Sequence, residues 1–111
     1  MKISAQDYEH ICVLMLSGDY TAEDADVFRR VADERIAGGA RHMLLDCANL
    51  EFIDSAGLES WLRLREALAP MNGQLCLINP DENVAMILRL TRLESNFTAH
   101  QTVEAAVRSV R

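Results

Sequence analysis

The chain has 111 residues, of which 50% are hydrophobic and 25% charged, and 17 acidic against 11 basic residues give a formal net charge of −6. This length suits one hydrophobic core, so we expect residues 1–111 to form a single domain. The acidic balance argues against nucleic acid as a partner. No apolar run approaches the ~20 residues of a membrane helix, and the polar start is unlike a signal peptide. We therefore expect a cytoplasmic protein without direct membrane insertion.

Short apolar runs predict about five strands. We expect an edge strand over 2–6, strands over 10–16 (HICVLML), 42–47 (HMLLDC) and 74–79 (QLCLIN), and a short strand near Phe97. Gly18 is expected to end the second strand. Helical stretches alternate with these strands, which predicts an α/β fold with parallel strand pairing and four α-helices.

Four stretches predict the helices. The first, TAEDADVFRRVADERIAGG (21–39), has a capping box of Thr21 and Asp24. The second opens at residue 54 or 55 and ends before Pro70, a third starts at 79–81, and a fourth ends the chain. The predicted buried stripes are Val27, Phe28, Val31 and Ile36; Leu58, Trp61, Leu62 and Leu68; Val84, Ile87, Leu88 and Thr91; and Val103, Ala106, Val107 and Val110.

Some residues have both a structural and a functional interpretation. Trp61 is expected in the core, with an aromatic anchor at an interface as the alternative. The three cysteines follow no CxxC spacing, so we expect apolar core thiols in a reducing compartment and neither a disulfide nor a zinc site. They are Cys12, Cys47 and Cys76. Three acids near one end of the sheet are the candidates for Mg²⁺, although such acids more often cap helices or face water. They are Asp46, Glu51 and Asp54. We expect no metal or cofactor.

The stretch DSAG (54–57) places an acid, a hydroxyl, a methyl and a glycine where a strand runs into a helix. Asp54 and Ser55 can each cap that helix, so one of them is free for another role. Gly57 inside a helix costs about 1 kcal/mol relative to alanine. This cost indicates a first turn kept bare for the close approach of another backbone. The pattern predicts a docking surface with a modifiable hydroxyl on Ser55.

A serine-dependent enzyme is the weaker interpretation. Ser55 does not lie in a G-x-S-x-G elbow, and the phosphate-binding patterns GxxxxGK[ST] and GxGxxG are absent. A serine nucleophile also needs a base, and nothing in the sequence brings a histidine to Ser55. The three histidines are His10, His42 and His100. We therefore expect no catalytic residue.

The stretch LLDCANLEFIDSAGLESWLRL (44–64) resembles the signature of STAS domains, the fold of bacterial anti-sigma factor antagonists. The positions that match are Asp46, Ile53, Asp54, Ser55, Gly57 and Leu58. Further matches are LSG (16–18), LCLINP (75–80) and LRLTRLESNF (88–97), so the resemblance covers essentially the whole chain.

The resemblance implies a small, mostly parallel mixed sheet of about five strands, with the first strand at an antiparallel edge and four flanking α-helices. It also implies a regulatory protein without catalytic activity. Such proteins bind a GHKL-type serine-kinase anti-sigma factor and release its sigma factor. The kinase phosphorylates the serine that matches Ser55, and a PP2C-type phosphatase reverses this. The implied partner-binding residues are Asp19, Thr21, Asp54, Ser55, Ala56, Gly57 and Leu58.

Two positions depart from the family pattern. Thr21 stands where many antagonists carry an aspartate, so a contribution of that acid to kinase binding is in doubt. Arg92 replaces the usual glycine of L-T-G-L, with an expected effect on local geometry only.

Two other functions remain alternatives. The same fold serves as a regulatory subunit of transporters, including lipid-trafficking ATP-binding cassette complexes, and as a module of larger sensory assemblies. The second alternative function is that of a small serine-dependent enzyme. Both a monomer and a weak dimer are compatible with the sequence.

Overall fold

The computed structural model describes residues 1–111 and contains one five-stranded sheet in the order β1-β2-β3-β4-β5. The strands are β1 (Lys2–Tyr8), β2 (Ile11–Tyr20), β3 (His42–Ile53), β4 (Leu75–Ile78) and β5 (Thr98–His100). β1 pairs with β2 in antiparallel fashion, and every other neighbouring pair is parallel. The predicted mixed sheet with an antiparallel first strand is confirmed.

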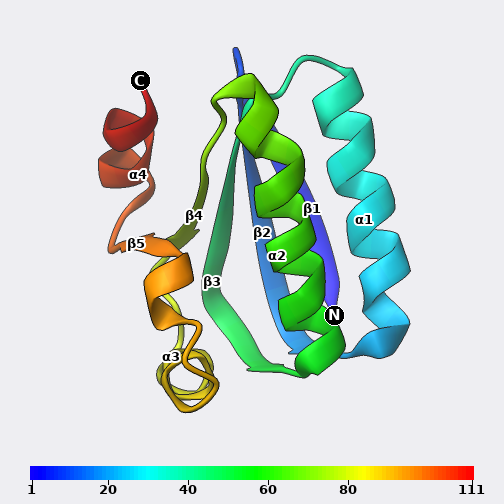
Figure 1. Ribbon diagram of the computed structural model, residues 1–111, viewed down its shortest axis with the longest axis vertical. Helices are drawn as coiled ribbons and strands as arrows, with labels where there is room; N and C mark the ends of the chain where they lie inside the picture. Colours follow the sequence, from blue (N-terminus) through cyan, green and yellow to red (C-terminus); the bar gives the residue numbers. More distant parts are fainter.

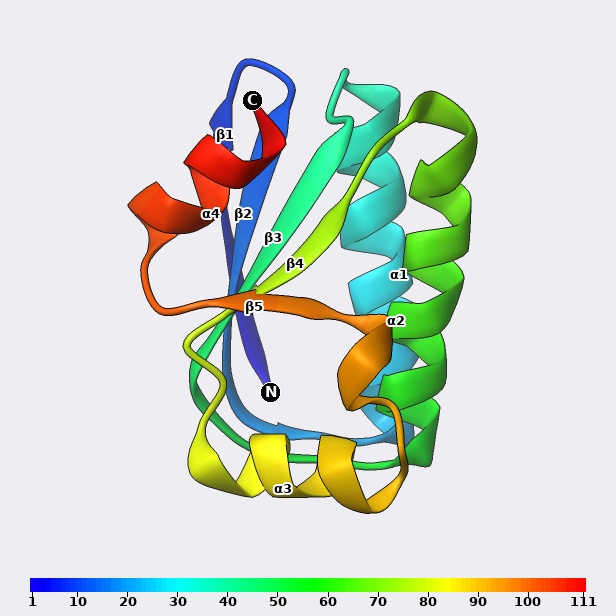
Figure 2. The ribbon, with the colours of Figure 1, turned by 60° about the vertical axis from the view of Figure 1, so that its left-hand side comes forward.

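Four helices flank the sheet, as predicted. They are α1 (Ala22–Ala37), α2 (Ser55–Leu68), α3 (Glu82–Leu90) and α4 (Val103–Val110). α1 and α2 lie side by side on one face, α4 covers the other face, and α3 lies across one end of the sheet (Figures 1 and 2). No helix combines the length and the apolar character that a membrane span requires.

The two faces of the sheet bury separate hydrophobic cores, which explains why the central strands are apolar at nearly every position. In β2, Cys12, Leu14 and Leu16 point into the larger core under α1 and α2. Ile11 and Val13, which alternate with them, point into the smaller core under α4. β3 and β4 divide their side chains in the same way.

Four aromatic rings join the larger core across distant parts of the chain. Tyr20 packs on Phe28, with ring centroids 5.5 Å apart, and edge-on against Trp61 at 6.2 Å. Phe97 also packs edge-on against Trp61, with ring centroids 5.9 Å apart. The prediction that Trp61 belongs to the core is confirmed, since its side chain is fully buried.

All three cysteines are buried and unpaired, as predicted. Burial raises the pKa of the Cys12 thiol to about 12, and raises the pKa values of Cys47 and Cys76 as well. A thiol with so high a pKa carries almost no thiolate at neutral pH, so these cysteines are packing residues.

The second and third strands are longer than predicted. β2 continues through Gly18 to Tyr20, and β3 continues through the expected loop to Ile53. Register irregularities between Met15 and Ser17 and after Gly18 mark β-bulges, which bend the paired strands without ending them. Gly18 suits such a position because its φ is +91°. The prediction that Gly18 ends the strand is wrong for this reason.

The buried stripe of α1 also differs from the prediction. Val27 is 46% exposed, whereas Phe28 and Ala32 are buried. Residues four apart lie on one helix face, and this face meets both the sheet and α2, so alanine replaces a larger residue where the helices approach. In α2, Leu64 is buried and Leu62 only half-buried.

The end of α3 explains why the family pattern has a glycine at position 92. The Arg92 amide donates to the carbonyl of Arg89 (3.1 Å), and the Leu93 amide donates to that of Leu88 (2.9 Å). These are the two bonds of a Schellman motif, whose first residue after the cap adopts a left-handed conformation. Arg92 has a φ of +61°, which costs a residue with a Cβ about 1–2 kcal/mol.

Arg92→Gly is therefore expected to stabilise the protein, by about 0.5–1 kcal/mol after the greater unfolded-state entropy of glycine is subtracted. Urea unfolding followed by circular dichroism measures this change. Arg89→Gly is the matched control, because glycine inside α3 should destabilise by about 1 kcal/mol. Equal destabilisation by both variants would contradict the assignment of strain to residue 92.

Candidate functional site

Two helices begin side by side at the carboxyl edge of the parallel strands. β2 ends at Tyr20 and β3 at Ile53, and these two residues are paired in the sheet. Each strand is followed by one residue, Thr21 or Asp54, before α1 or α2 begins. The two helix N-termini therefore lie at the same end of the molecule (Figure 1). This edge is where α/β folds usually place their functional surface.

The Asp54 carboxylate connects the two helices. Its Oδ1 accepts a hydrogen bond from the Gly57 amide in the first turn of α2 (2.9 Å). Its Oδ2 accepts one from the Ala22 amide, the first of α1 (2.9 Å). The Asp54 amide in turn donates to the Tyr20 carbonyl (3.0 Å). One negative side chain thus satisfies two positive helix ends, where a carboxylate is favoured.

Ser55 is the first residue of α2 and is exposed. Asp54 is the N-cap, which decides between the two capping residues that the sequence allowed. The Ser55 hydroxyl forms no hydrogen bond within the chain. The first bond inside the helix runs from the Leu58 amide to the Asp54 carbonyl (3.0 Å), so the amides of Ser55 and Ala56 remain open. The start of α2 therefore presents the free hydroxyl of Ser55 beside the free amides of Ser55 and Ala56.

Gly57 has a different purpose from the one predicted. It is buried, and a Cβ placed on it would lie 2.7 Å from both Ile53 Cγ1 and Tyr20 Cδ1. The glycine therefore lets the first turn of α2 settle onto its own core, and the prediction that it keeps a bare surface for a partner is wrong. Leu58 is also buried, with 5% of its surface exposed, and supports the site from below.

A hydroxyl pair fixes the first turn of α2 from inside. The Tyr20 hydroxyl lies 2.5 Å from Ser60 Oγ, and Ser60 Oγ donates to the Gly57 carbonyl (2.6 Å). Burial raises the pKa of Tyr20, so its hydroxyl stays protonated and remains a hydrogen-bonding partner.

The other predicted contact residues flank this turn. Thr21 caps α1: its amide and its hydroxyl both donate to the Asp24 carboxylate, at 3.0 and 3.2 Å. The Thr21 amide is the main reason that the pKa of Asp24 is lowered. Asp19 is exposed and pairs with Phe52 in the sheet. Phe52 is 43% exposed and is not among the predicted contact residues, because the sequence predicts a loop where β3 continues.

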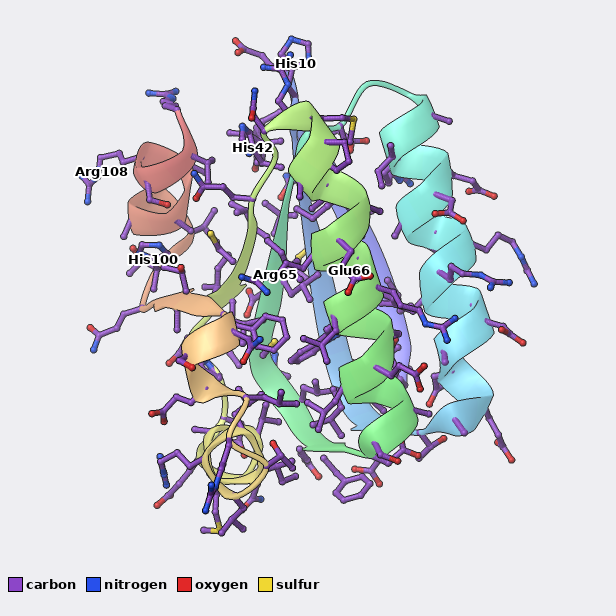
Figure 3. All side chains as sticks on the ribbon, in the orientation of Figure 1. His10, His42, Arg65, Glu66, His100 and Arg108 are labelled. Atoms are coloured by element: carbon purple, nitrogen blue, oxygen red, sulfur yellow. The ribbon has the colours of Figure 1, made fainter.

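The histidines lie away from Ser55. His10 and His42 lie at the end of the sheet opposite to the start of α2, and His100 lies on β5 beside α4 (Figure 3). His42 Nδ1 accepts from the Gln74 amide (3.0 Å), and burial lowers the pKa of this histidine. None of them forms a hydrogen bond with Ser55 in this arrangement. The predicted acidic candidates do not form a group able to hold a metal ion, nor do other acids, histidines or cysteines.

Asp54→Ala is expected to destabilise the protein by about 2 kcal/mol, because two helix ends lose their acceptor and each such cap contributes ~1 kcal/mol. Asp81→Ala is the matched control: Asp81 caps α3 through a single bond to the Asn83 amide (3.0 Å), so about 1 kcal/mol is expected. Denaturant titrations of both variants measure the difference. Equal losses would show that the bond to α1 contributes nothing.

Gly57→Ala is expected to lower the free energy of unfolding by about 1–2 kcal/mol, because the added methyl overpacks the contact with Ile53 and Tyr20. Helix propensity alone predicts the opposite sign, a gain of about 1 kcal/mol. Thermal unfolding distinguishes the two, with Ser55→Ala as a control that should change little. A stabilised Gly57→Ala variant would disprove the packing explanation.

A family model described as STAS domain matches residues 2–106. A Thermotoga maritima protein named "Putative anti-sigma factor antagonist" is 27% identical over 104 residues, which are 93% of this chain and 92% of that protein. The fold is also similar to that of a murine Slc26a9 anion transporter structure, with a TM-score of 0.64 and 15% identity over 77% of this chain and 14% of that one.

The fold of the Bacillus protein SpoIIAA, described as an anti-sigma factor antagonist, is closely similar along its whole length. Its unphosphorylated form has a TM-score of 0.84 at 19% identity, covering 99% of both chains. Its phosphorylated form has a TM-score of 0.77 at 20% identity, covering 99% of this chain and 100% of that one. The family model and the sheet topology confirm the resemblance seen in the D-S-A-G-L stretch: this chain belongs to the STAS domain family.

Proposed function

We propose that this protein is an anti-sigma factor antagonist, which binds a serine-kinase anti-sigma factor and frees the sigma factor held by that kinase. Phosphorylation of Ser55 switches it off. One observation carries the proposal: Asp54 caps α2 and leaves the Ser55 hydroxyl exposed and unbonded. The names of the Thermotoga maritima relative and of SpoIIAA, whose two phosphorylation states share this fold, support the same function.

A phosphate on Ser55 would affect binding more than folding. It carries about −1.5 to −2 charges at pH 7. The helix dipole and the open amides favour it, by up to ~2 kcal/mol in good geometry, while the adjacent Asp54 carboxylate opposes it. At an interface the same charge must be desolvated, at a cost of several kcal/mol when it is badly placed. A loss of ~2.8 kcal/mol already lowers affinity a hundredfold.

The partner surface consists of the exposed residues around the start of α2. Ser55 and Asp19 are accessible, Asp54 and Ala56 are half-buried, and Phe52 adds an exposed aromatic ring. Gly57 and Leu58, which are buried, position this surface from below, and the half-buried Thr21 flanks it. The kinase is of the GHKL type, a PP2C-type phosphatase restores the free hydroxyl, and the protein acts in the cytoplasm without a catalytic role of its own.

The second candidate function is that of a regulatory subunit of a transporter or of a larger sensory complex. The fold similarity to Slc26a9 favours this alternative, because it shows the same fold within an anion transporter. The two functions differ in how they depend on Ser55: a phosphorylation switch requires its hydroxyl, whereas a fixed subunit requires only the fold.

We expect Ser55→Asp to weaken kinase binding at least about a hundredfold while the melting temperature stays within a few degrees, because acidic residues are tolerated at a helix N-terminus. Ser55→Ala should bind the kinase and resist inactivation. The measurement is capture from the native host's lysate by tagged variants, with mass spectrometry of the bound proteins. Ser95→Asp, at another exposed serine, controls for the added charge.

Recovery of a GHKL kinase with the wild type, Ser55→Ala and Ser95→Asp but not with Ser55→Asp supports the proposal. Recovery of a transporter ATPase with all four proteins favours the alternative. If Ser55→Asp unfolds the protein, the switch does not act at the interface.

A further inference from the structure

The surface between α1 and α2 contains an apolar groove, of which the proposed partner surface uses only Ala56. Its cavity volume is about 350 Å³, the lower end of the range for small-molecule and cofactor sites. Its apolar lining consists of Ala25, Phe28, Ala32, Ala56, Leu64 and Ala67. Four of these six are alanines, whose small side chains leave the groove open at the surface above the point where the two helices pack together. Ser55 does not line this groove.

The charged residues on the rim form bands across the groove. Both helices start at the Asp54 carboxylate, so residues at equal distance from Ala22 and Ser55 lie at about the same level. Asp26 and Glu59 are each the fifth residue of their helix. Arg29 is the eighth residue of α1 and Arg63 the ninth of α2. Two acids thus line the groove at the same level on its two sides, and two arginines follow about one turn later.

A third band follows on one side. Asp33 is the twelfth residue of α1, and opposite it α2 has Ala67, its thirteenth residue. The rim therefore changes from acid to base to acid at intervals of about four residues, or about 6 Å along the helices. The arginines also contact acids on their own helix, Asp26 at 4.0 Å and Glu59 at 2.7 Å, which holds them beside the groove.

We propose that this groove binds one amphipathic α-helix of a protein partner, whose apolar stripe rests on the accessible alanines Ala25, Ala56 and Ala67 and whose flanking charges run base, acid, base. Helix-in-groove recognition uses such an apolar floor with residues spaced by one turn. The alternating rim favours a helix over a lipid chain, because a bare alkyl chain offers no charges to match the three bands. Because the acid–base–acid order is symmetric, the partner helix can lie in either direction.

This groove shares only Ala56 with the proposed partner surface, and Ser55 does not line it. We therefore expect binding in the groove to persist when Ser55 is replaced. The inference does not depend on the anti-sigma function, and its test uses a designed peptide in place of an unidentified partner.

The probe is an alanine-rich helical peptide of about 20 residues with a leucine and alanine stripe and Lys–Glu–Lys bands at successive turns. A control peptide of identical composition has its bands in the order Lys–Lys–Glu, so its net charge is the same. Fluorescence anisotropy with the intact protein measures both affinities. We expect the matched peptide to bind at least about tenfold more tightly, a difference of about 1.4 kcal/mol.

Two variants test where the peptide binds. Glu59→Arg combined with Arg63→Glu preserves the net charge and the pairing within α2, but disrupts two bands. Ala67→Trp fills the groove, and Ala37→Trp, at an exposed position outside it, is the matched control. The double variant and Ala67→Trp should each lose the preference for the matched peptide. Ala37→Trp and Ser55→Asp should retain it, which separates this result from any failure of the proposed switch.

A preference below about tenfold, or no saturable binding up to about 1 mM peptide, would overturn the proposal. Retention of the preference by Ala67→Trp would also overturn it, because the peptide would then bind elsewhere. Saturable binding of a fatty acid that Ala67→Trp abolishes, without peptide binding, would identify a lipid site instead.

Discussion

The Asp54 carboxylate is the interaction on which the arrangement of the helices depends. Each of its oxygens accepts an amide from the first turn of a different helix, α1 at Ala22 and α2 at Gly57. The carboxylate interacts favourably with the partial positive charges of two helix N-termini at once. The first turns of both helices are thereby placed at a common level over the sheet. The paired ends of β2 and β3 bring the two helix starts within its reach.

In this arrangement the residues of the D-S-A-G stretch have different structural roles. Asp54 satisfies the helix ends, so Ser55 has no capping role and its hydroxyl remains free for chemistry. Gly57 supplies the space in which the turn packs on Ile53 and Tyr20. The serine is thus presented on a turn held by hydrogen bonds outside and by tight packing inside. A charge added at Ser55 meets a rigid surface, which suits a switch that changes binding without changing the fold.

The same carboxylate sets the register of the groove. Because α1 and α2 start together, acids lie level with acids, and arginines with arginines, on the two sides of the groove. The alanines let the helices pack together over the aromatic cluster and leave the groove open at the surface. The serine turn and the groove are therefore two outcomes of one packing geometry, and they differ in chemistry: the first offers a modifiable hydroxyl, the second a charged rim around an apolar floor.

Periodicity and turn residues in the sequence were enough for the α/β class, the four helices and the exposure of Ser55, because these follow from local patterns. The antiparallel first strand was expected from the resemblance to STAS domains. Strand ends were not predictable, since the bulges near Gly18 depend on pairing between β2 and β3. The sequence determined that Asp54 or Ser55 caps α2. Only the tertiary structure decided that it is Asp54, because the second bond comes from Ala22, 32 residues away. It likewise decided that Gly57 faces inward, since the neighbours that exclude a Cβ include the ring of Tyr20, from a different strand.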